Sequence, residues 1–195
     1  MFVSSSHKFV FFHVPKTGGS SITAALAGTS DVTGRGWQAR FHVNGMHSVY
    51  EEVRGTLRAD YPKHLVFAFF RNPWSRALSL YKHAHDDGES LVEYFERWKN
   101  GTCRGRNNRD LNCDPQVSFI VPDACDFVGR FERLEEDFVR LCGQLDIKCE
   151  LGHLNRNRTD PTDHVNWRSA YTSQDQVDIV AECFADDVRL LGYEF

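Results

Sequence analysis

The sequence predicts an α/β fold in which a largely parallel sheet is covered by helices on both faces. Continuous apolar runs at residues 9–14 and 65–70 indicate strands buried on both faces, and a third strand is expected at residues 126–131. A helical pattern follows each of these strands, as in parallel sheets with crossover helices. The 195 residues are enough for one domain with a substantial core, so we expect a single domain over residues 1–195.

The first strand leads into a turn that suits an anion. Residues 9–14 are aromatic and β-branched, and Pro15–Gly19 then break the strand with one cation, Lys16. Ser20 or Ser21 is expected to cap the helix that follows. Backbone N–H groups and the helix dipole converge at such a turn, and hydroxyl groups add further donors, so phosphate or sulfate is the expected guest.

This turn differs from the common loop that binds nucleoside triphosphates. That loop reads G-x-x-x-x-G-K-[ST], with the lysine after the last glycine, whereas Lys16 precedes Gly18 and Gly19. A simple βα turn with a surface lysine is the alternative, because glycine-rich turns are frequent in α/β folds. A second signal is needed to decide between the two.

That second signal follows the strand at residues 65–70. The strand ends at Arg71, a turn at Asn72-Pro73 follows, and a helical stretch then carries Arg76 and Ser79. Taken alone, Arg71 reads as a strand-end arginine in a salt bridge and Ser79 as a solvent-facing helix residue. The proline turn nevertheless allows Arg71 and Ser79 to reach one phosphate, although eight residues separate them.

With both motifs in view, the sequence resembles the sulfotransferases that use 3′-phosphoadenosine 5′-phosphosulfate (PAPS). Residues 15–21, Pro-Lys-Thr-Gly-Gly-Ser-Ser, are similar to the family's 5′-phosphosulfate loop, and Arg71-Asn72-Pro73 with Ser79 resembles its 3′-phosphate site. The resemblance implies a P-loop-like, three-layer fold that binds PAPS as co-substrate and releases PAP. It assigns nucleotide binding to Lys16, Thr17, Gly18, Gly19, Ser20, Ser21, Arg71, Ser79 and, from a late loop shared with Arg156, Arg158.

Two later blocks resemble the carbohydrate-modifying branch of that family. They are residues 127–138 and the C-terminal residues 186–195. This implies a hydroxyl acceptor on a sugar or glycoconjugate, with an amine or phenol as the alternative. The segment 100–115 is either a solvated loop or an acceptor lid that uses Arg104, Arg106 and Arg109.

The family resemblance also predicts the chemistry. Sulfuryl transfer needs in-line positioning and charge stabilisation, which Lys16 and the backbone amides of residues 17–21 are suited to supply without a metal. The main alternative is a nucleotide kinase or NTPase, which would require the G-K-[ST] pattern that this sequence lacks. A third possibility is a PAP- or glycan-binding module without turnover.

A hydroxyl acceptor also needs a general base, and histidine is the usual choice. His47 stands just ahead of a helix expected at residues 48–57, in a stretch that resembles the family block where a histidine opens a helix. We therefore predict His47 as the base. His13 and the carboxylates Glu51 and Glu52 remain as alternatives.

The composition limits the possible binding partners and the cellular compartment of the protein. Lys and Arg number 23 against 27 Asp and Glu, a net charge of −4, so no global basic field attracts nucleic acid. No run is long enough to span a membrane and no signal peptide precedes the first strand, so we expect a cytoplasmic enzyme. The luminal domain of a Golgi-type enzyme is the alternative. Six cysteines without a C-x-x-C pair are expected to be mostly reduced and to bind no metal.

Further helices are predicted from apolar spacing and capping residues. Apolar residues recur at helical spacing from residue 134 to residue 141 and from residue 177 to residue 191, which predicts a helix in each segment. Ser-x-x-Glu and Ser-x-x-Gln patterns beginning at Ser90 and Ser173 predict capping boxes. The second of these is expected to open one long C-terminal helix. Trp74 is expected either to stack on the nucleotide base or to lie in the core.

Overall fold

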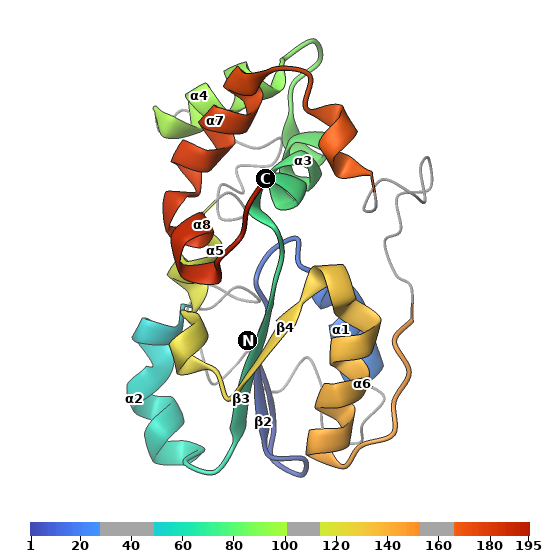
Figure 1. Cartoon of the computed structure of the whole chain (residues 1–195). Helices are drawn as coiled ribbons and strands as arrows, with labels where there is room; N and C mark the ends of the chain where they lie inside the picture. Colours follow the sequence, from blue (N-terminus) through green and yellow to red (C-terminus); the bar gives the residue numbers. More distant parts are fainter. Residues whose placement is uncertain (28–48, 101–113, 153–165) are drawn as a thin grey trace.

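The computed structural model describes residues 1–27, 49–100, 114–152 and 166–195. Its centre is a four-stranded sheet with the order β1-β2-β3-β4 (Figure 1). The strands are β1 (Phe2–Ser4), β2 (Phe9–Phe12), β3 (Leu65–Phe70) and β4 (Phe127–Arg130). β2, β3 and β4 are parallel, and β1 pairs antiparallel with β2. The predicted α/β fold with a largely parallel sheet is confirmed.

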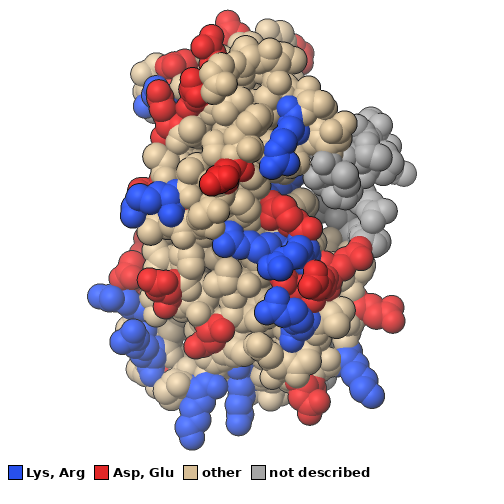
Figure 2. All heavy atoms as spheres, viewed as in Figure 1, with Lys and Arg blue, Asp and Glu red and all other residues tan. Residues whose placement is uncertain are grey.

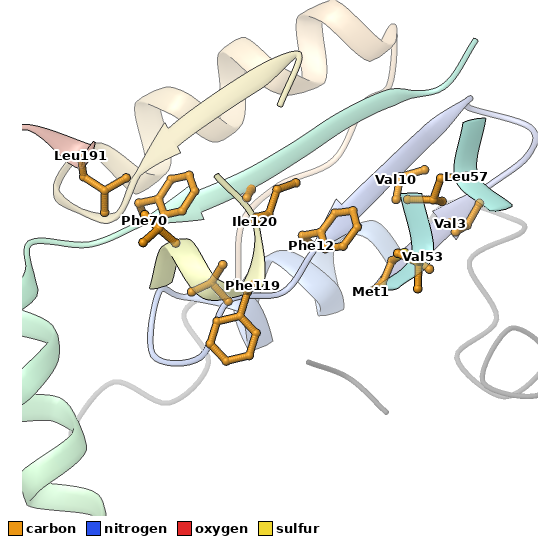
Figure 3. Close-up of a cluster of buried hydrophobic side chains, with 13 residues drawn as sticks. Met1, Val3, Val10, Phe12, Val53, Leu57, Phe70, Phe119, Ile120 and Leu191 are labelled. Carbon is orange, nitrogen blue, oxygen red and sulfur yellow. The ribbon is translucent and has the colours of Figure 1, made fainter. Parts of the chain in front are cut away.

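Helices cover both faces of the sheet (Figure 1). One face carries α1 (Gly19–Ala27) and α6 (Leu134–Leu145), and the other carries α2 (Tyr50–Asp60). Successive strand residues point to opposite faces, so Phe11 packs in the cluster of α1 and α6 whereas Val10 and Phe12 pack with α2. Figure 3 shows the cluster on the α2 side, where Val53 and Leu57 meet the sheet. The helix expected at residues 48–57 is thus present, shifted by two to three residues.

A second group of helices lies beyond the carboxyl ends of the parallel strands (Figure 1). It comprises α3 (Pro73–Ala84), α4 (Leu91–Lys99), the 3-10 helix η4 (Trp167–Ala170), α7 (Gln174–Cys183) and α8 (Ala185–Leu191). Tyr94, Phe95 and Phe184 lie at the centre of its own apolar core. The other described elements are α5 (Gln116–Phe119) and the 3-10 helices η2 (Pro122–Ala124) and η3 (Phe131–Arg133).

Side-chain caps fix the start of two helices in this group. Asn72 accepts the N–H groups of Trp74 and Ser75, and Pro73 occupies the first helical position of α3. Ser90 and Glu93 form the predicted capping box of α4. Both devices follow directly from residue types in the sequence.

Three expectations about helix ends are wrong. α1 begins at Gly19, so Ser20 and Ser21 lie in its first turn instead of capping it. The predicted long C-terminal helix is divided into α7 and α8 at Phe184, whose backbone leaves the helical region at φ −119° and ψ 34°. Ser173 makes no side-chain capping bond, because Gln176 accepts instead from the N–H of Thr172 at 2.7 Å.

Three further observations complete the fold. The edge strand β1 was not predicted, because three residues are too few to show a periodic pattern. No described helix has the length and apolar character needed to cross a membrane. Among the described cysteines, all four are thiols: Cys125, Cys142, Cys149 and Cys183.

Close packing of β4 on β3 gives a stability prediction. A Cβ atom at Gly129 would lie 2.3 Å from the Phe69 ring, inside van der Waals contact, so Gly129→Ala is expected to destabilise the fold by about 1–3 kcal/mol. Gly143, in α6, has open space around the same position, and Gly143→Ala is expected to stabilise by about 0.5–1 kcal/mol. Urea unfolding of both variants checks the pair. Equal changes in the free energy of unfolding would show that the contact with the Phe69 ring does not determine the effect of the substitution at Gly129.

Candidate active site

The two sequence motifs lie at the same edge of the sheet. β2 and β3 are neighbouring parallel strands, with Phe12 opposite Ala68. The segments that follow these two strands therefore leave the same edge of the sheet side by side. Ligands of open α/β sheets bind at this edge. One ligand can therefore contact both the turn after β2 and the segment that begins at Arg71.

The turn after β2 has a backbone that few residues tolerate. Lys16 has φ +67° and Gly18 has φ +83°. The Thr17 hydroxyl donates to the carbonyl oxygen of Val14 at 2.9 Å, and the Ser21 N–H donates to Gly18 at 3.0 Å. These bonds fold the turn onto the N-terminus of α1, where the first N–H groups of a helix lack intrahelical partners. The result is a backbone cradle for an anion.

Gly19 must be glycine for a steric reason. A Cβ atom there would lie 2.0 Å from the ring of His13, which is buried beneath the turn and stacks on Phe11 at 5.8 Å. His13 therefore supports the turn from below. This position does not suit a base that meets an acceptor entering from solvent.

Arg71 is held in place by the neighbouring elements. Its Nε donates to Ser75 Oγ at 2.8 Å, and its Nη1 donates to the carbonyl oxygen of Lys16 at 3.3 Å. The guanidinium group lies 4.1 Å from the ring centre of Phe131. Gln116 fixes the backbone of Arg71 through two 2.8 Å hydrogen bonds. Arg71 thus joins the two motifs instead of forming only a strand-end contact.

Behind Arg71 lies a fully buried charged pair. Arg76 and Asp187 have no exposed surface, with Nη1 and Oδ2 3.9 Å apart. Arg76 Nε also donates to the carbonyl oxygen of Pro15 at 3.0 Å, and Asp187 accepts from the backbone N–H groups of Gln116 and Val117 at 2.9 Å. This network connects the turn after β2, α3, α5 and α8.

The network gathers positive charge around Lys16. Burial lowers the pKa of the Lys16 ammonium group, and the nearby Arg71 and Arg76 guanidinium groups lower it further. Figure 2 shows that charges of both signs alternate over the surface in that view. The concentration of positive charge is therefore a local property of this site in a chain with a net charge of −4.

The structure places the other predicted residues as follows. Ser79 is half-buried on α3, one turn beyond Ser75 on the same helix face. The Thr17 hydroxyl is buried and donates to the Val14 carbonyl oxygen, so Thr17 offers its backbone N–H, not its side chain, to a bound anion. Trp74 lies in the core, with its indole N–H bonded to Val177 at 2.9 Å, and so does not stack on a base. The residues outside the described ranges are His47, Arg104, Arg106, Arg109, Arg156 and Arg158.

Sequence reasoning missed Gln116, Asp187 and Phe131. Phe131 and Asp187 lie within the two later blocks and Gln116 lies in no motif, but sequence alone assigns none of them a role, because each supports Arg71 or Arg76 across at least 45 residues of sequence. Among the described residues, no group of three or more His, Cys, Asp and Glu side chains could hold a metal ion. That the reaction needs no metal stays a prediction.

Comparison with known proteins agrees with this geometry. The chain matches the family described as "Sulfotransferase family" over residues 1–194. It belongs to the sulfotransferase family. A relative from Archaeoglobus fulgidus, named only as an uncharacterized protein, is 30% identical over 89 residues, which is 45% of this chain and 72% of the relative. No solved structure matches significantly.

Sulfotransferases in general use PAPS, and the residues of this sulfotransferase fit that substrate. PAPS carries two separate anionic groups, and two cationic segments, the turn with Lys16 and the segment with Arg71, lie next to each other at this edge of the sheet. Three cations lie close together here, with Asp187 buried behind Arg76. A bound anion would relieve their mutual repulsion, which supports the fit.

The buried pair gives a prediction with a pH dependence. Arg76→Met leaves Asp187 buried without its cation and is expected to cost about 3–5 kcal/mol of stability at neutral pH. Arg189→Met removes an exposed partner of Asp186 and is expected to cost less than about 1 kcal/mol. Chemical denaturation measures both variants.

The sign of the pH effect follows from Asp187. Burial raises the pKa of this carboxyl group, and Arg76 lowers it. Without Arg76 the pKa of Asp187 rises further, so the folded variant binds a proton that the unfolded chain releases, and its loss of stability relative to the wild type becomes smaller as the pH falls below neutral. A deficit that is the same at acidic and neutral pH would contradict this account.

Proposed function

We propose that this sulfotransferase transfers the sulfuryl group of PAPS to a hydroxyl group of a sugar or glycoconjugate by in-line displacement. One observation supports this most strongly: Arg71 donates to the Lys16 carbonyl oxygen and Arg76 to the Pro15 carbonyl oxygen, so both guanidinium groups lie against the glycine turn that carries Lys16 before α1. An arrangement of donors at a helix N-terminus stabilises negative charge that develops in a transition state.

The proposed reaction forms one bond and breaks one. The acceptor oxygen bonds to sulfur as the bond from sulfur to the bridging oxygen of the 5′-phosphate breaks, and the electron pair stays on that phosphate oxygen. Lys16 and the backbone amides of residues 17–21 hold the developing charge. Arg71 and Ser79 hold the 3′-phosphate, in keeping with the shared helix face of Ser75 and Ser79.

We assign the general base to His47, which takes the acceptor proton. Tyr50 supports the assignment, because it follows His47 by three residues and packs against Phe12 at the end of β2, with ring centres 5.6 Å apart. The alternatives are weakened. His13 lies buried under the turn, and Glu51 pairs with Arg54 at 3.0 Å on the surface of α2.

The carbohydrate acceptor is proposed from residues 127–138 and 186–195. In the structure these blocks support the Arg71 segment: Glu132 accepts from the Asn72 N–H at 2.7 Å and from the Tyr193 hydroxyl at 2.8 Å. The similarity of these blocks to the carbohydrate-modifying branch is what favours a sugar hydroxyl group over an amine or phenol. We further propose that the enzyme is one domain, acts in the cytoplasm and does not bind nucleic acid.

A transfer assay tests the proposed function. Radiolabelled PAPS is offered with a panel of sugars, glycans and simple phenols, and products are identified by mass spectrometry. The proposal expects sulfated sugar as the main product. Transfer to phenols in preference to every sugar would reject the carbohydrate acceptor, and no transfer at all despite PAP binding would favour a binding module.

Lys16→Ala is expected to lower kcat by about a hundredfold or more, the usual loss when a transition-state donor is removed. The affinity for PAP, measured by calorimetry, should fall much less, because Lys16 acts mainly on charge that develops during transfer. Lys63→Ala, at an exposed position before β3, is the matched control and should behave as wild type. A kcat within a few-fold of wild type in Lys16→Ala would make Lys16 an ordinary loop residue.

Removal of the 3′-phosphate contacts should change nucleotide selectivity. Arg71→Ala and Ser79→Ala are each expected to weaken PAP by about tenfold or more, since a charge-assisted hydrogen bond contributes about 1.5–3 kcal/mol. AMP, which lacks the 3′-phosphate, should be affected far less and serves as the internal control. Equal losses for PAP and AMP would refute the assignment.

A further inference from the structure

Two cysteine side chains meet at the C-terminal end of α6. Cys142 lies near the end of the helix and Cys149 in the segment that follows it, and their Sγ atoms are 3.0 Å apart. The other two described cysteines, Cys125 and Cys183, each donate to a backbone carbonyl oxygen. Cys142 and Cys149 are thus two thiols that the fold has already brought into contact.

A left-handed turn holds the two sulfur atoms together. Asp146 has φ +52°, a conformation that Asp adopts more readily than most residues, and the chain reverses there at the end of α6 (Figure 1). The N–H groups of Asp146 and Ile147 both donate to the carbonyl oxygen of Cys142, the second at 3.0 Å. Ile147 is 8% exposed and packs in the core beside α6. The contact between the two sulfur atoms is therefore set by the native backbone.

The contact is close enough for a covalent bond to replace it. An S–S bond is about 2.05 Å long, so the two sulfur atoms need to approach by roughly 1 Å, which rotation of the side chains can supply. Because the turn keeps the thiols together, a bond between them forms within one molecule and competes well with the attachment of a second external thiol.

The pair lies at a surface cavity that a reagent can enter. Both cysteines line a cavity of about 430 Å³, whose other lining residues include Val139, Lys148 and Glu150. Val139 is 70% exposed, so this side of α6 faces solvent. Cys149 is half-buried, whereas Cys142 is buried, and burial raises the pKa of its thiol. Since the thiolate is the attacking species in disulfide exchange, Cys149 is the sulfur that reacts first.

We propose that Cys142 and Cys149 form a redox-active dithiol, which small disulfides such as oxidised glutathione convert to an intramolecular disulfide. Lys148 and Glu150 place one charge of each sign at the cavity, which suits a peptide disulfide that carries both ammonium and carboxylate groups. The dithiol lies outside the nucleotide site and does not depend on the proposed transfer reaction.

The proposed oxidation takes place in two exchange steps. The Cys149 thiolate attacks one sulfur of the small disulfide, whose S–S bond breaks, and the departing thiolate takes up a proton. The Cys142 thiol then gives its proton to water, and its thiolate attacks the Cys149 sulfur and releases the second small thiol. Two protein thiols are oxidised, and one small disulfide is reduced to two thiols.

Peptide mapping of the wild-type chain tests the pair directly. The folded protein is incubated with oxidised glutathione, quenched with acid, alkylated and digested with trypsin, which cleaves after Arg140 and Lys148. The two cysteines then lie on separate peptides, residues 141–148 and residues 149–156, which mass spectrometry should find linked before treatment with dithiothreitol and separate after it. Two free thiols, glutathione on Cys149 without the link, or a link from either residue to another of the six cysteines would each overturn the proposal.

Single substitutions test the order of the two steps. Cys142→Ser is expected to leave Cys149 as a lasting mixed disulfide with glutathione, because no second thiol displaces it. Cys149→Ser should leave Cys142 almost unmodified, because Cys142 is buried. Cys125→Ser keeps the pair and is the control that should form the same linked peptides as the wild type. Equal modification of Cys142 and Cys149 in the two variants would contradict the assigned order.

Oxidation is also expected to stabilise the fold. The bond closes a loop over residues 142–149, and restricting that loop in the unfolded chain should raise Tm by about 5–10 °C. Scanning fluorimetry compares the oxidised and reduced wild type, and Cys149→Ser treated in the same way should show no rise. A lower Tm in the oxidised wild type would show that the bond distorts the fold, and it would reject a dithiol prepared by the native turn.

Discussion

The buried contact between Arg76 and Asp187 is the constraint on which the site depends. It joins the turn after β2, the helix α3, the short helix α5 and the C-terminal helix α8, although these segments are far apart in the chain. A buried ion pair is expensive to desolvate, so its value lies less in stability than in fixing one arrangement of the elements around it. Here that arrangement sets Lys16 and Arg71 side by side.

The same arrangement creates an electrostatic need. The nearby Arg71 and Arg76 guanidinium groups lower the pKa of the Lys16 ammonium group, and Asp187 is buried behind Arg76. Neighbouring positive charges repel one another, so the cluster favours a ligand with several negative charges. A nucleotide with phosphate groups at two positions meets that need without a basic surface elsewhere on the molecule.

The sequence predicted those parts of the fold that depend on local patterns. β2 and β3 were predicted because aromatic runs end at a glycine or proline turn, and α4 because Ser90 and Glu93 form a local capping box. The break at Phe184 could not be predicted, because it depends on where that ring packs against Phe95 and Arg76 from distant helices. Lys16 and Arg71 were recognised from motifs, whereas Gln116 and Asp187 required the three-dimensional contacts.

Calorimetric titration of the wild-type enzyme with PAP and with ATP in the presence of Mg²⁺ tests the central claim most directly. If the cationic cluster is built for a nucleotide with separate 3′ and 5′ anionic groups, PAP should bind with clearly higher affinity than ATP, and its affinity should not depend on Mg²⁺. Tighter binding of Mg²⁺-ATP than of PAP would contradict this account and would place the site among those of nucleoside triphosphates.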